Sequence, residues 1–360
     1  MCSLLLLIAA PAHATEYGDL GLHGRVQASD VVVVARVVDP TLALVSVEWA
    51  LKGDVPKQFT LVAYVDGFAI PTQRKLLVAN ARELMFLTKK GDAYAPVQDQ
   101  YGRMAVNGDR LTDSFRADPR SLSQTIASVH RLVTLQTRAA RNDSEADRAY
   151  VAAFASPDVE VQKWALQTSF HRITAPSPAL ADALLTHWKK DTGAVPDTWP
   201  HDAGLVANAV VTWRLRRAAP LFAETLKTSG DGERRAFAAM ALGGTGDRTY
   251  LSQLREVAAR DPHPQARALA YNGIMYMLGP DSLGDLRQGA RDAEARVRAR
   301  AVVDAYNLLE LAQPEPRWPR PSKALIVEVR AFLTEMQRDP ARLVSDNAKS
   351  MLAMIARQRP

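Results

Sequence analysis

The segments DGERRAFAAMALGGTGDRTYLSQLREVAAR (231–260), DPHPQARALAYNGIMYMLGPDSLGDLRQGAR (261–291) and DAEARVRARAVVDAYNLL (292–309) decide the fold of this chain. Each segment begins with an aspartate and then carries an arginine three residues before an alanine. These pairs are Arg235/Ala238, Arg267/Ala270 and Arg298/Ala301. A pattern that returns about every 30 residues predicts a stacked repeat.

One repeat has the pattern of two short helices. In the first segment, Ala238, Ala241 and Leu242 fall at i, i+3 and i+4, which places an apolar stripe along one helix face. Glycines follow at 243, 244 and 246 and end that helix, and a second stripe runs through 251–258. Two such helices cannot bury their stripes alone, so neighbouring pairs must share one core. The sequence therefore predicts an all-α solenoid.

These segments resemble HEAT repeats, in particular the short bacterial form that also occurs in phycobilisome lyases. That pattern has an aspartate, then Val-Arg-x-x-Ala with the arginine six residues after the aspartate, then Leu-Gly and Gly-Asp. Asp292 and Val297–Ala301 carry it in full, and Asp261–Ala270 carries it with Ala266 in place of the valine. Leu242-Gly243 and Gly246-Asp247 supply the helix end.

The first residues look like an export signal. Residues 1–14, MCSLLLLIAAPAHA, combine an apolar run with the small-residue pattern Ala12-His13-Ala14, which predicts cleavage after Ala14. The run is too short to span a bilayer. We therefore expect a periplasmic or secreted protein without a transmembrane segment, although a buried amphipathic N-terminus is the alternative. Cys2 is the only cysteine and would leave with this segment.

Residues 15–118 have the texture of a β domain. Short β-branched or alternating runs are separated by turn residues, which predicts a small antiparallel barrel or sandwich. The expected strands are Val31–Val38, Leu42–Trp49, Phe59–Val65, Lys75–Val78, Glu83–Leu87, Ala93–Val97 and Met104–Val106. The order of the first, second and fifth runs resembles netrin-like, OB-type barrels of exported proteins. That resemblance implies, as one alternative, a role as a peptidase inhibitor.

The remaining residues are predicted to be helical. Residues 119–144 form a helical linker, because Leu122, Ile126 and Val129 lie on one face of a helix. Residues 145–360 form the HEAT-like solenoid. The fold class is thus α+β with two domains, an N-terminal antiparallel β-barrel of OB or netrin-like type followed by the solenoid.

The sequence contains no recognisable catalytic motif. The seven histidines never occur at metal-ligand spacing, and no Gly-x-Ser-x-Gly elbow is present. Gly243–Asp247 resembles a phosphate loop, but it follows a helix and lacks Lys-Ser/Thr, so helix termination is the better interpretation. We therefore expect no catalytic, cofactor-binding or metal-binding residues.

The repeated charges predict a structural ladder. In HEAT repeats the aspartates and arginines of successive units pair along the stack, and the matching residues here are Arg235, Asp261, Arg267, Asp292 and Arg298. An unpaired buried arginine would be costly, which favours pairing. The alternative is that the arginines face the groove and bind a carboxylate or a phosphate.

The helix that carries Arg-x-x-Ala is predicted to line the concave groove. Its positions outside the predicted core form a candidate protein-binding face: Phe237, Met240, Leu269, Asn272, Tyr276, Arg300, Val303 and Asn307. Packing against the next repeat is the alternative for the same side chains.

The net charge of +6 is modest for 360 residues, and together with the export signal it argues against nucleic acid as a partner. The predicted function is an exported, non-enzymatic protein that binds or scaffolds another protein through the concave face. Two alternatives stay open, an enzyme of lyase type built on HEAT repeats and a peptidase inhibitor that acts through the β domain.

Overall fold

The computed structural model describes residues 21–62, 77–97, 103–112, 117–190, 202–309 and 320–357. The chain divides into two compact units after Ile173. We call the described residues up to Ile173 the sheet unit and those that follow the helical unit. Residues 1–14, for which the sequence predicts an export signal, lie outside the described ranges.

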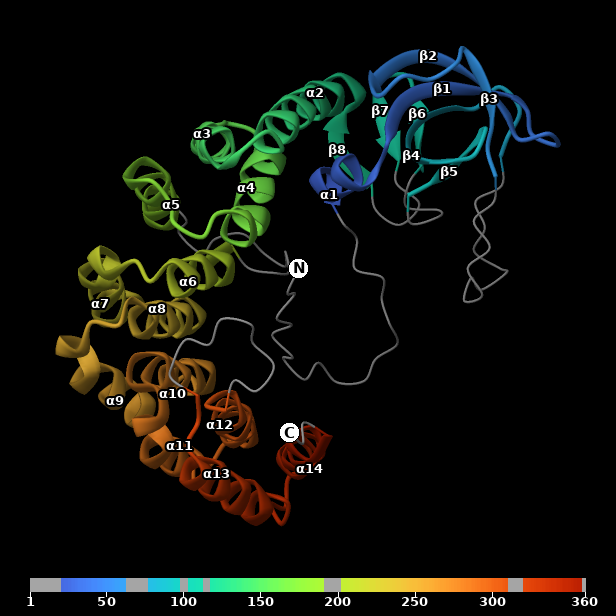
Figure 1. Cartoon of the computed structure of the whole chain (residues 1–360). Helices are drawn as coiled ribbons and strands as arrows, with labels where there is room; N and C mark the ends of the chain where they lie inside the picture. Colours follow the sequence, from blue (N-terminus) through green and yellow to red (C-terminus); the bar gives the residue numbers. More distant parts are fainter. Residues whose placement is uncertain are drawn as a thin grey trace. The chain divides into compact units, whose positions relative to one another are not determined.

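The sheet unit contains one antiparallel sheet, coloured blue to teal in Figure 1. Its strand order is β3-β2-β1-β4-β6-β7-β8, and β5 pairs with β4. The strands are β1 (Val31–Asp39), β2 (Leu44–Lys52), β3 (Gln58–Thr60), β4 (Arg82–Lys90), β5 (Ala93–Pro96), β6 (Arg103–Asn107), β7 (Arg110–Thr112) and β8 (Ala117–Ser121). Every strand pair is antiparallel, as the sequence predicts.

The sheet curls around a core that β1 supplies. Val31, Val33, Ala35 and Val37 point to one side and pack with residues of β2, β3, β4 and β5. An isolated bridge between Leu61 and Tyr94 brings the chain after β3 next to β5, so the sheet bends back on itself. Val32 and Val34 on the other face are also buried, which explains why β1 begins with an unbroken apolar run, Val31–Ala35, rather than an alternating one.

The sequence missed several details of this sheet. Strands β7 and β8 and the short helix α1 (Gly21–Ala28) were not predicted, because their few residues carry no clear period. The run predicted at Phe59–Val65 gives only the short β3, and residues 63–65 lie outside the described ranges. Of the strand predicted at Lys75–Val78, residues 75–76 lie outside them too, and Leu77 and Val78 are not in a strand.

Three longer helices complete the sheet unit, namely α2 (Leu122–Ala139), α3 (Asp143–Phe154) and α4 (Val159–Arg172). Helix α2 packs on α1, α3 and β2. It begins at Leu122 rather than at Pro119, because Ser121 caps it and forms a capping box with Gln124. The division after Ile173 therefore places α3 and α4 with the sheet, whereas the sequence predicts a helical domain that begins at residue 145.

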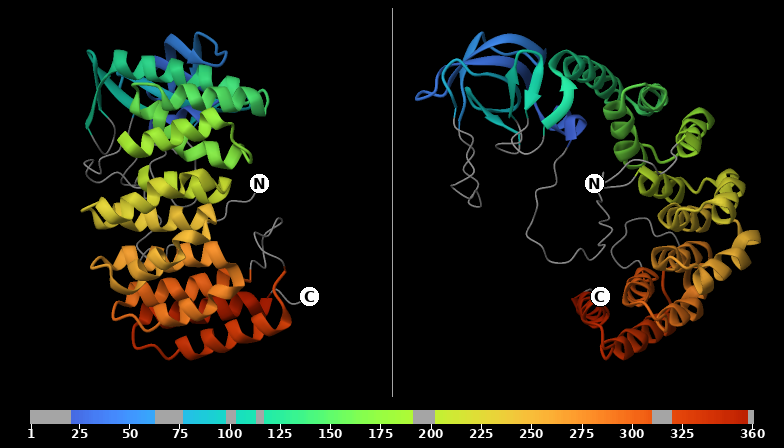
Figure 2. Two further views of the ribbon diagram at one scale, coloured as in Figure 1. Left: turned by 90° about the vertical axis from the view of Figure 1, so that its left-hand side faces the viewer. Right: turned by 180° about the vertical axis from the view of Figure 1, so that it is seen from behind.

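The helical unit consists of helices in two layers (Figures 1 and 2). They are α5 (Pro178–Lys190), α6 (Asp202–Trp213), α7 (Ala219–Thr228), α8 (Gly232–Thr245), α9 (Leu251–Arg260), α10 (Pro264–Leu278), α11 (Leu283–Gly289), α12 (Ala295–Asn307), α13 (Lys323–Met336) and α14 (Arg342–Arg357). Helices α6, α8, α10, α12 and α14 pack in succession, and we call them the inner row. Helices α7, α9, α11 and α13 form the outer row, each against the inner helix that follows it in the chain.

Glycines set the closest contact between inner helices. A Cβ atom at Gly243 of α8 would lie 2.0 Å from the carbonyl oxygen of Gly273 of α10, and a Cβ at Gly273 would lie 2.4 Å from the carbonyl oxygen of Ala239. The two backbones therefore touch without intervening side chains. The glycines at 243 and 244 do not end α8, which continues to Thr245, and Gly246 adopts the left-handed conformation that closes it.

Candidate functional site

An arginine–aspartate ladder links the repeats of the helical unit. Arg235 donates Nε and Nη2 hydrogen bonds to the two carboxylate oxygens of Asp261, both at 2.8 Å. Arg267 holds Asp292 in the same way at 2.8 and 2.9 Å, and Arg298 holds Asp339 at 2.8 and 2.9 Å. Each arginine thus binds the aspartate that precedes the next inner helix. We call these three pairs the ladder.

Each member of the ladder also binds the backbone. The Nη1 groups of Arg235, Arg267 and Arg298 donate to the carbonyl oxygens six residues earlier, at 3.0, 2.9 and 3.0 Å. Each aspartate accepts a backbone N–H two residues later, at 2.8 Å in all three cases. The ladder therefore fixes the turn that enters each of α10, α12 and α14, as well as joining one repeat to the next.

Asp339 was not among the residues predicted from the sequence. It lies 41 residues after its partner Arg298, whereas the other two pairs are 26 and 25 residues apart. Residues 310–319, outside the described ranges, fall in that longer interval and interrupt the period. A shared dipeptide could have found it, since Arg260-Asp261, Arg291-Asp292 and Arg338-Asp339 are alike.

The ladder holds its carboxylates in the charged form. Burial alone would raise the pKa of Asp261, but the hydrogen bonds from Arg235 and from the His263 N–H outweigh it and lower that pKa below 3.8. The same balance lowers the pKa of Asp292, with Arg267 as the main donor. For Asp339 the hydrogen bond from Arg298 is the largest influence and also lowers the pKa.

A second polar cluster lies between α10 and α12 of the inner row. Asp304 is fully buried, and its Oδ1 accepts hydrogen bonds from Asn272 Nδ2 and Arg300 Nε, both at 2.9 Å. Burial raises the pKa of Asp304, although Arg300, Asn272 and Asn307 each act to lower it. The chain therefore keeps an ion pair inside the helix packing, where charge is costly.

The predicted binding face is only partly accessible. Met240, Leu269 and Asn272 are 2%, 3% and 0% exposed, which corrects their assignment as surface contacts. The inner helices pack side by side, so these positions are used between helices, as Asn272 shows through its hydrogen bond to Asp304. The other predicted positions are half-buried and keep some access to solvent: Phe237, Tyr276, Arg300, Val303 and Asn307.

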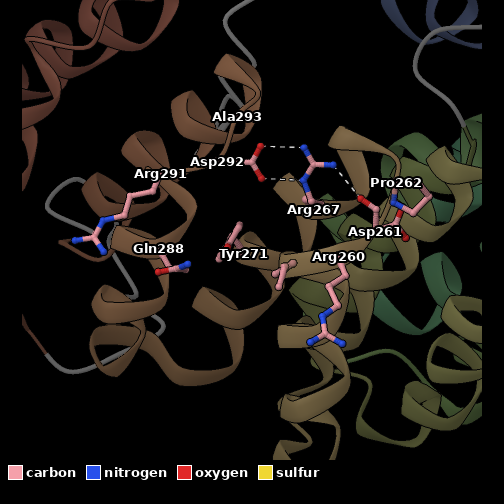
Figure 3. A pocket seen from close by; sticks show the side chains of 11 residues that line it. Arg260, Asp261, Pro262, Arg267, Tyr271, Gln288, Arg291, Asp292 and Ala293 are labelled. Carbon is pink, nitrogen blue, oxygen red and sulfur yellow. Dashed lines mark hydrogen bonds and ion pairs between the residues drawn. The ribbon is translucent and has the colours of Figure 1, made fainter.

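A pocket of about 480 Å³ lies at the turns that carry the ladder (Figure 3). Its residues come from the end of α9 and the turn that follows it, from α10, from the end of α11 and from the segment that joins α11 to α12. Figure 3 shows Arg267 between Asp292 and the backbone of Asp261, with Tyr271 and Gln288 beside it. Arg260 and Arg291 extend away from this pair on separate sides. This pocket was not predicted from the sequence.

The described ranges contain neither a metal-ligand cluster nor a membrane-spanning helix. No group of three or more His, Cys, Asp or Glu side chains there is arranged to hold a metal ion. No helix in the same ranges combines the length and the apolar character needed to cross a membrane.

Comparison with known proteins agrees with the repeats. A family model of HEAT repeats matches residues 219–307, which run from the start of α7 to the end of α12. A search of curated proteins found no match. The matched residues include Arg235, Arg267 and Arg298 with two of their three aspartates. The helical unit of this chain therefore contains HEAT repeats.

Proposed function

We propose that this chain is an exported scaffold that binds another protein through the inner row of a HEAT-repeat solenoid. The observation that carries the proposal is that the inner helices, which the ladder joins to one another, keep several side chains only half-buried. Phe237 on α8, Tyr276 on α10 and Val303 on α12 are half-buried, and these three helices pack in succession. Stacked repeats of this kind present extended binding surfaces.

The chemistry of these side chains suits a protein partner. Aromatic residues are enriched at the centres of protein interfaces, where they are surrounded by polar contacts. The half-buried positions of the inner row are a phenylalanine, a tyrosine and a valine together with the polar Asn307 and Arg300. The ladder lies at the turns, so it holds the inner helices in register without covering these half-buried side chains. We therefore propose that the half-buried side chains of the inner row, and not the ladder, select the partner.

A pull-down from cell-envelope extract tests the proposal. Val303→Glu places a charge on the inner row, and Val327→Glu makes the same change on α13 of the outer row, where the valine is 66% exposed. We expect the wild type and Val327→Glu to retain the same partner and Val303→Glu to lose it. If the purified wild-type chain retains no partner, or if both variants retain it equally, the inner row is not the binding face.

Export is the second part of the proposal, and it rests on residues 1–14. Cell fractionation followed by N-terminal sequencing tests it. A mature chain that begins at Thr15 and separates with the envelope or the medium agrees with it, whereas an uncleaved chain in the cytoplasm contradicts it.

We also propose that the sheet unit has an OB-type or netrin-like barrel fold. Its antiparallel pairing and the Leu61–Tyr94 bridge support this. An experimental structure that shows an open sheet with unpaired edges in place of a barrel would refute it.

A further inference from the structure

An exposed arginine precedes each aspartate of the ladder. These residues are Arg260, Arg291 and Arg338, and we call them the arginine row. Within the part of the chain that the structure describes, none of the three has an ion-pair or hydrogen-bond partner for its guanidinium. The aspartates beside them do not neutralise them, because Arg235, Arg267 and Arg298 already occupy both carboxylate oxygens of each.

Two members of the arginine row flank the pocket of about 480 Å³ (Figure 3). The carboxylates that line this pocket, Asp261 and Asp292, are both in the ladder. What the pocket can still offer a ligand is cationic and polar: the guanidinium groups of Arg260 and Arg291 and the amide of Gln288. A pocket with this balance of groups favours an anion.

The helix dipole gives an alternative account of these positions. Arg260 ends α9, and Arg291 and Arg338 follow the ends of α11 and α13, where a positive charge is favourable. A lysine would satisfy the dipole equally well. The dipole also does not explain the pocket between the first two arginines. A planar guanidinium fork, in contrast, suits the two oxygens of a carboxylate.

We propose that the arginine row binds an acidic segment of a partner protein, with one carboxylate in the pocket that Arg260 and Arg291 line. The proposal deepens the proposed function and rests on it. Packed helices lie about 8–10 Å apart, and a chain in the polyproline II conformation advances about 3.1 Å per residue with three residues per turn. A segment bound in that conformation would therefore present an acidic side chain to the arginine row at every third residue.

Fluorescence anisotropy with a synthetic peptide tests this on the full chain. The probe is a labelled, flexible Gly/Ser peptide of about a dozen residues with glutamate at every third position. The same peptide with glutamine in those positions is the ligand control. We expect the glutamate peptide to bind, the glutamine peptide to bind far more weakly, and the affinity to fall as salt is added.

The protein variants separate the arginine row from general charge. Arg260→Ala/Arg291→Ala should weaken binding at least about tenfold. Arg248→Ala/Arg330→Ala is the matched control, since it removes the same charge from exposed arginines of η4 (Arg248–Tyr250) and α13, and it should leave binding within about twofold. Arg260→Lys/Arg291→Lys keeps the charge and the dipole contact, so an intermediate affinity is expected if the forked geometry matters.

Several outcomes would overturn the proposal. Equal loss in both alanine double variants would show attraction by net charge only. Full affinity in the lysine double variant would show that the guanidinium geometry is not needed, so that the helix dipole alone would explain why these positions are basic. Tighter binding of inorganic phosphate or of a single-stranded oligonucleotide, measured by competition, would assign the arginine row to phosphate.

The proposed function has a separate test in Val303→Glu, which does not alter the arginine row. Loss of the peptide site with an intact pull-down would remove only this inference. Failure of the pull-down in the wild type would remove the scaffold itself.

Discussion

At the scale of single residues, Asp304 and Arg300 form an ion pair whose carboxylate is fully buried. We expect Arg300→Met to destabilise the folded chain by about 3–5 kcal/mol at neutral pH, because it leaves Asp304 buried without its cation. The pKa of Asp304 is already raised by burial, so the folded state binds the proton more tightly than the unfolded state does. The loss must therefore shrink as pH falls towards the raised pKa.

Urea denaturation of both proteins at about pH 7 and about pH 5 measures this effect. Arg330→Met, at an exposed position of α13, is the control and should change the free energy of unfolding by less than about 0.5 kcal/mol. If Arg300→Met lowers the free energy of unfolding equally at both pH values, the uncompensated charge of Asp304 is not the cause.

Substitution by alanine is expected to have opposite effects on stability at Gly243 and at Gly284. Gly243→Ala would place a methyl group 2.0 Å from the Gly273 carbonyl oxygen, so α8 and α10 must separate, at a cost of about 1–3 kcal/mol or more. Gly284 lies in α11, and a Cβ atom added there would meet nothing within 4 Å, so Gly284→Ala should stabilise by up to about 1 kcal/mol. Thermal unfolding of the two variants decides the comparison. A stable Gly243→Ala chain would contradict the close contact.

Residue-level prediction from the sequence had a clear limit. The arginines and aspartates of the ladder could be named because charge and spacing repeat together in the chain. Met240, Leu269 and Asn272 could not be placed, because a helical period shows which residues share a face but not which neighbours cover that face. Asn272 is a polar residue on a buried face, and only the position of Asp304 on the next inner helix explains it.

At the scale of elements, the ladder is expected to stabilise more than surface ion pairs of the same geometry. Asp261 and Asp285 allow a matched comparison, since both accept two arginine hydrogen bonds at 2.8–2.9 Å. The side chains of Arg235 and Asp261 are 13% and 6% exposed, whereas those of Arg255 and Asp285 are 52% and 17% exposed.

We expect Asp261→Ala to cost about 2–4 kcal/mol, because it leaves Arg235 without its carboxylate and removes the acceptor of the His263 N–H in the turn before α10. Asp285→Ala should cost less than about 1 kcal/mol. Chemical denaturation measures both. Equal costs would mean that the ladder is no more than another surface pair.

The elements themselves were predicted unevenly. Long helices with glycine or proline ends, such as α8 and α10, follow directly from the apolar period. Strand β1 follows from its run of valines. Three-residue strands such as β3 and β7 are fixed by their partners across the sheet rather than by their own residues, so no local sequence pattern predicts them.

At the scale of the whole molecule, the ladder predicts acid sensitivity of the helical unit. The pKa values of Asp261, Asp292 and Asp339 are lowered in the folded state. Each contribution is therefore complete above the unfolded pKa of about 3.8 and disappears as pH falls through the lower, folded pKa. Circular dichroism across a pH series should show helix loss below about pH 4. Asp261→Asn should show a weaker pH dependence there, and an unchanged dependence would exclude the ladder as its source.

The sequence predicts the α+β class and the HEAT repeats because the repeats are built from local pairs of helices. The division after Ile173 depends on long-range packing of α1, α2 and α4 with one another, which periodicity does not report.

The central claim is that the inner row of the HEAT repeats binds a partner protein. Site-specific photo-cross-linking in living cells tests it most directly, with the reactive group placed at Val303 on α12 or at Val327 on α13. We predict a discrete protein adduct from position 303 and none from position 327. Adducts of equal strength at both positions, or at position 327 alone, would contradict the claim.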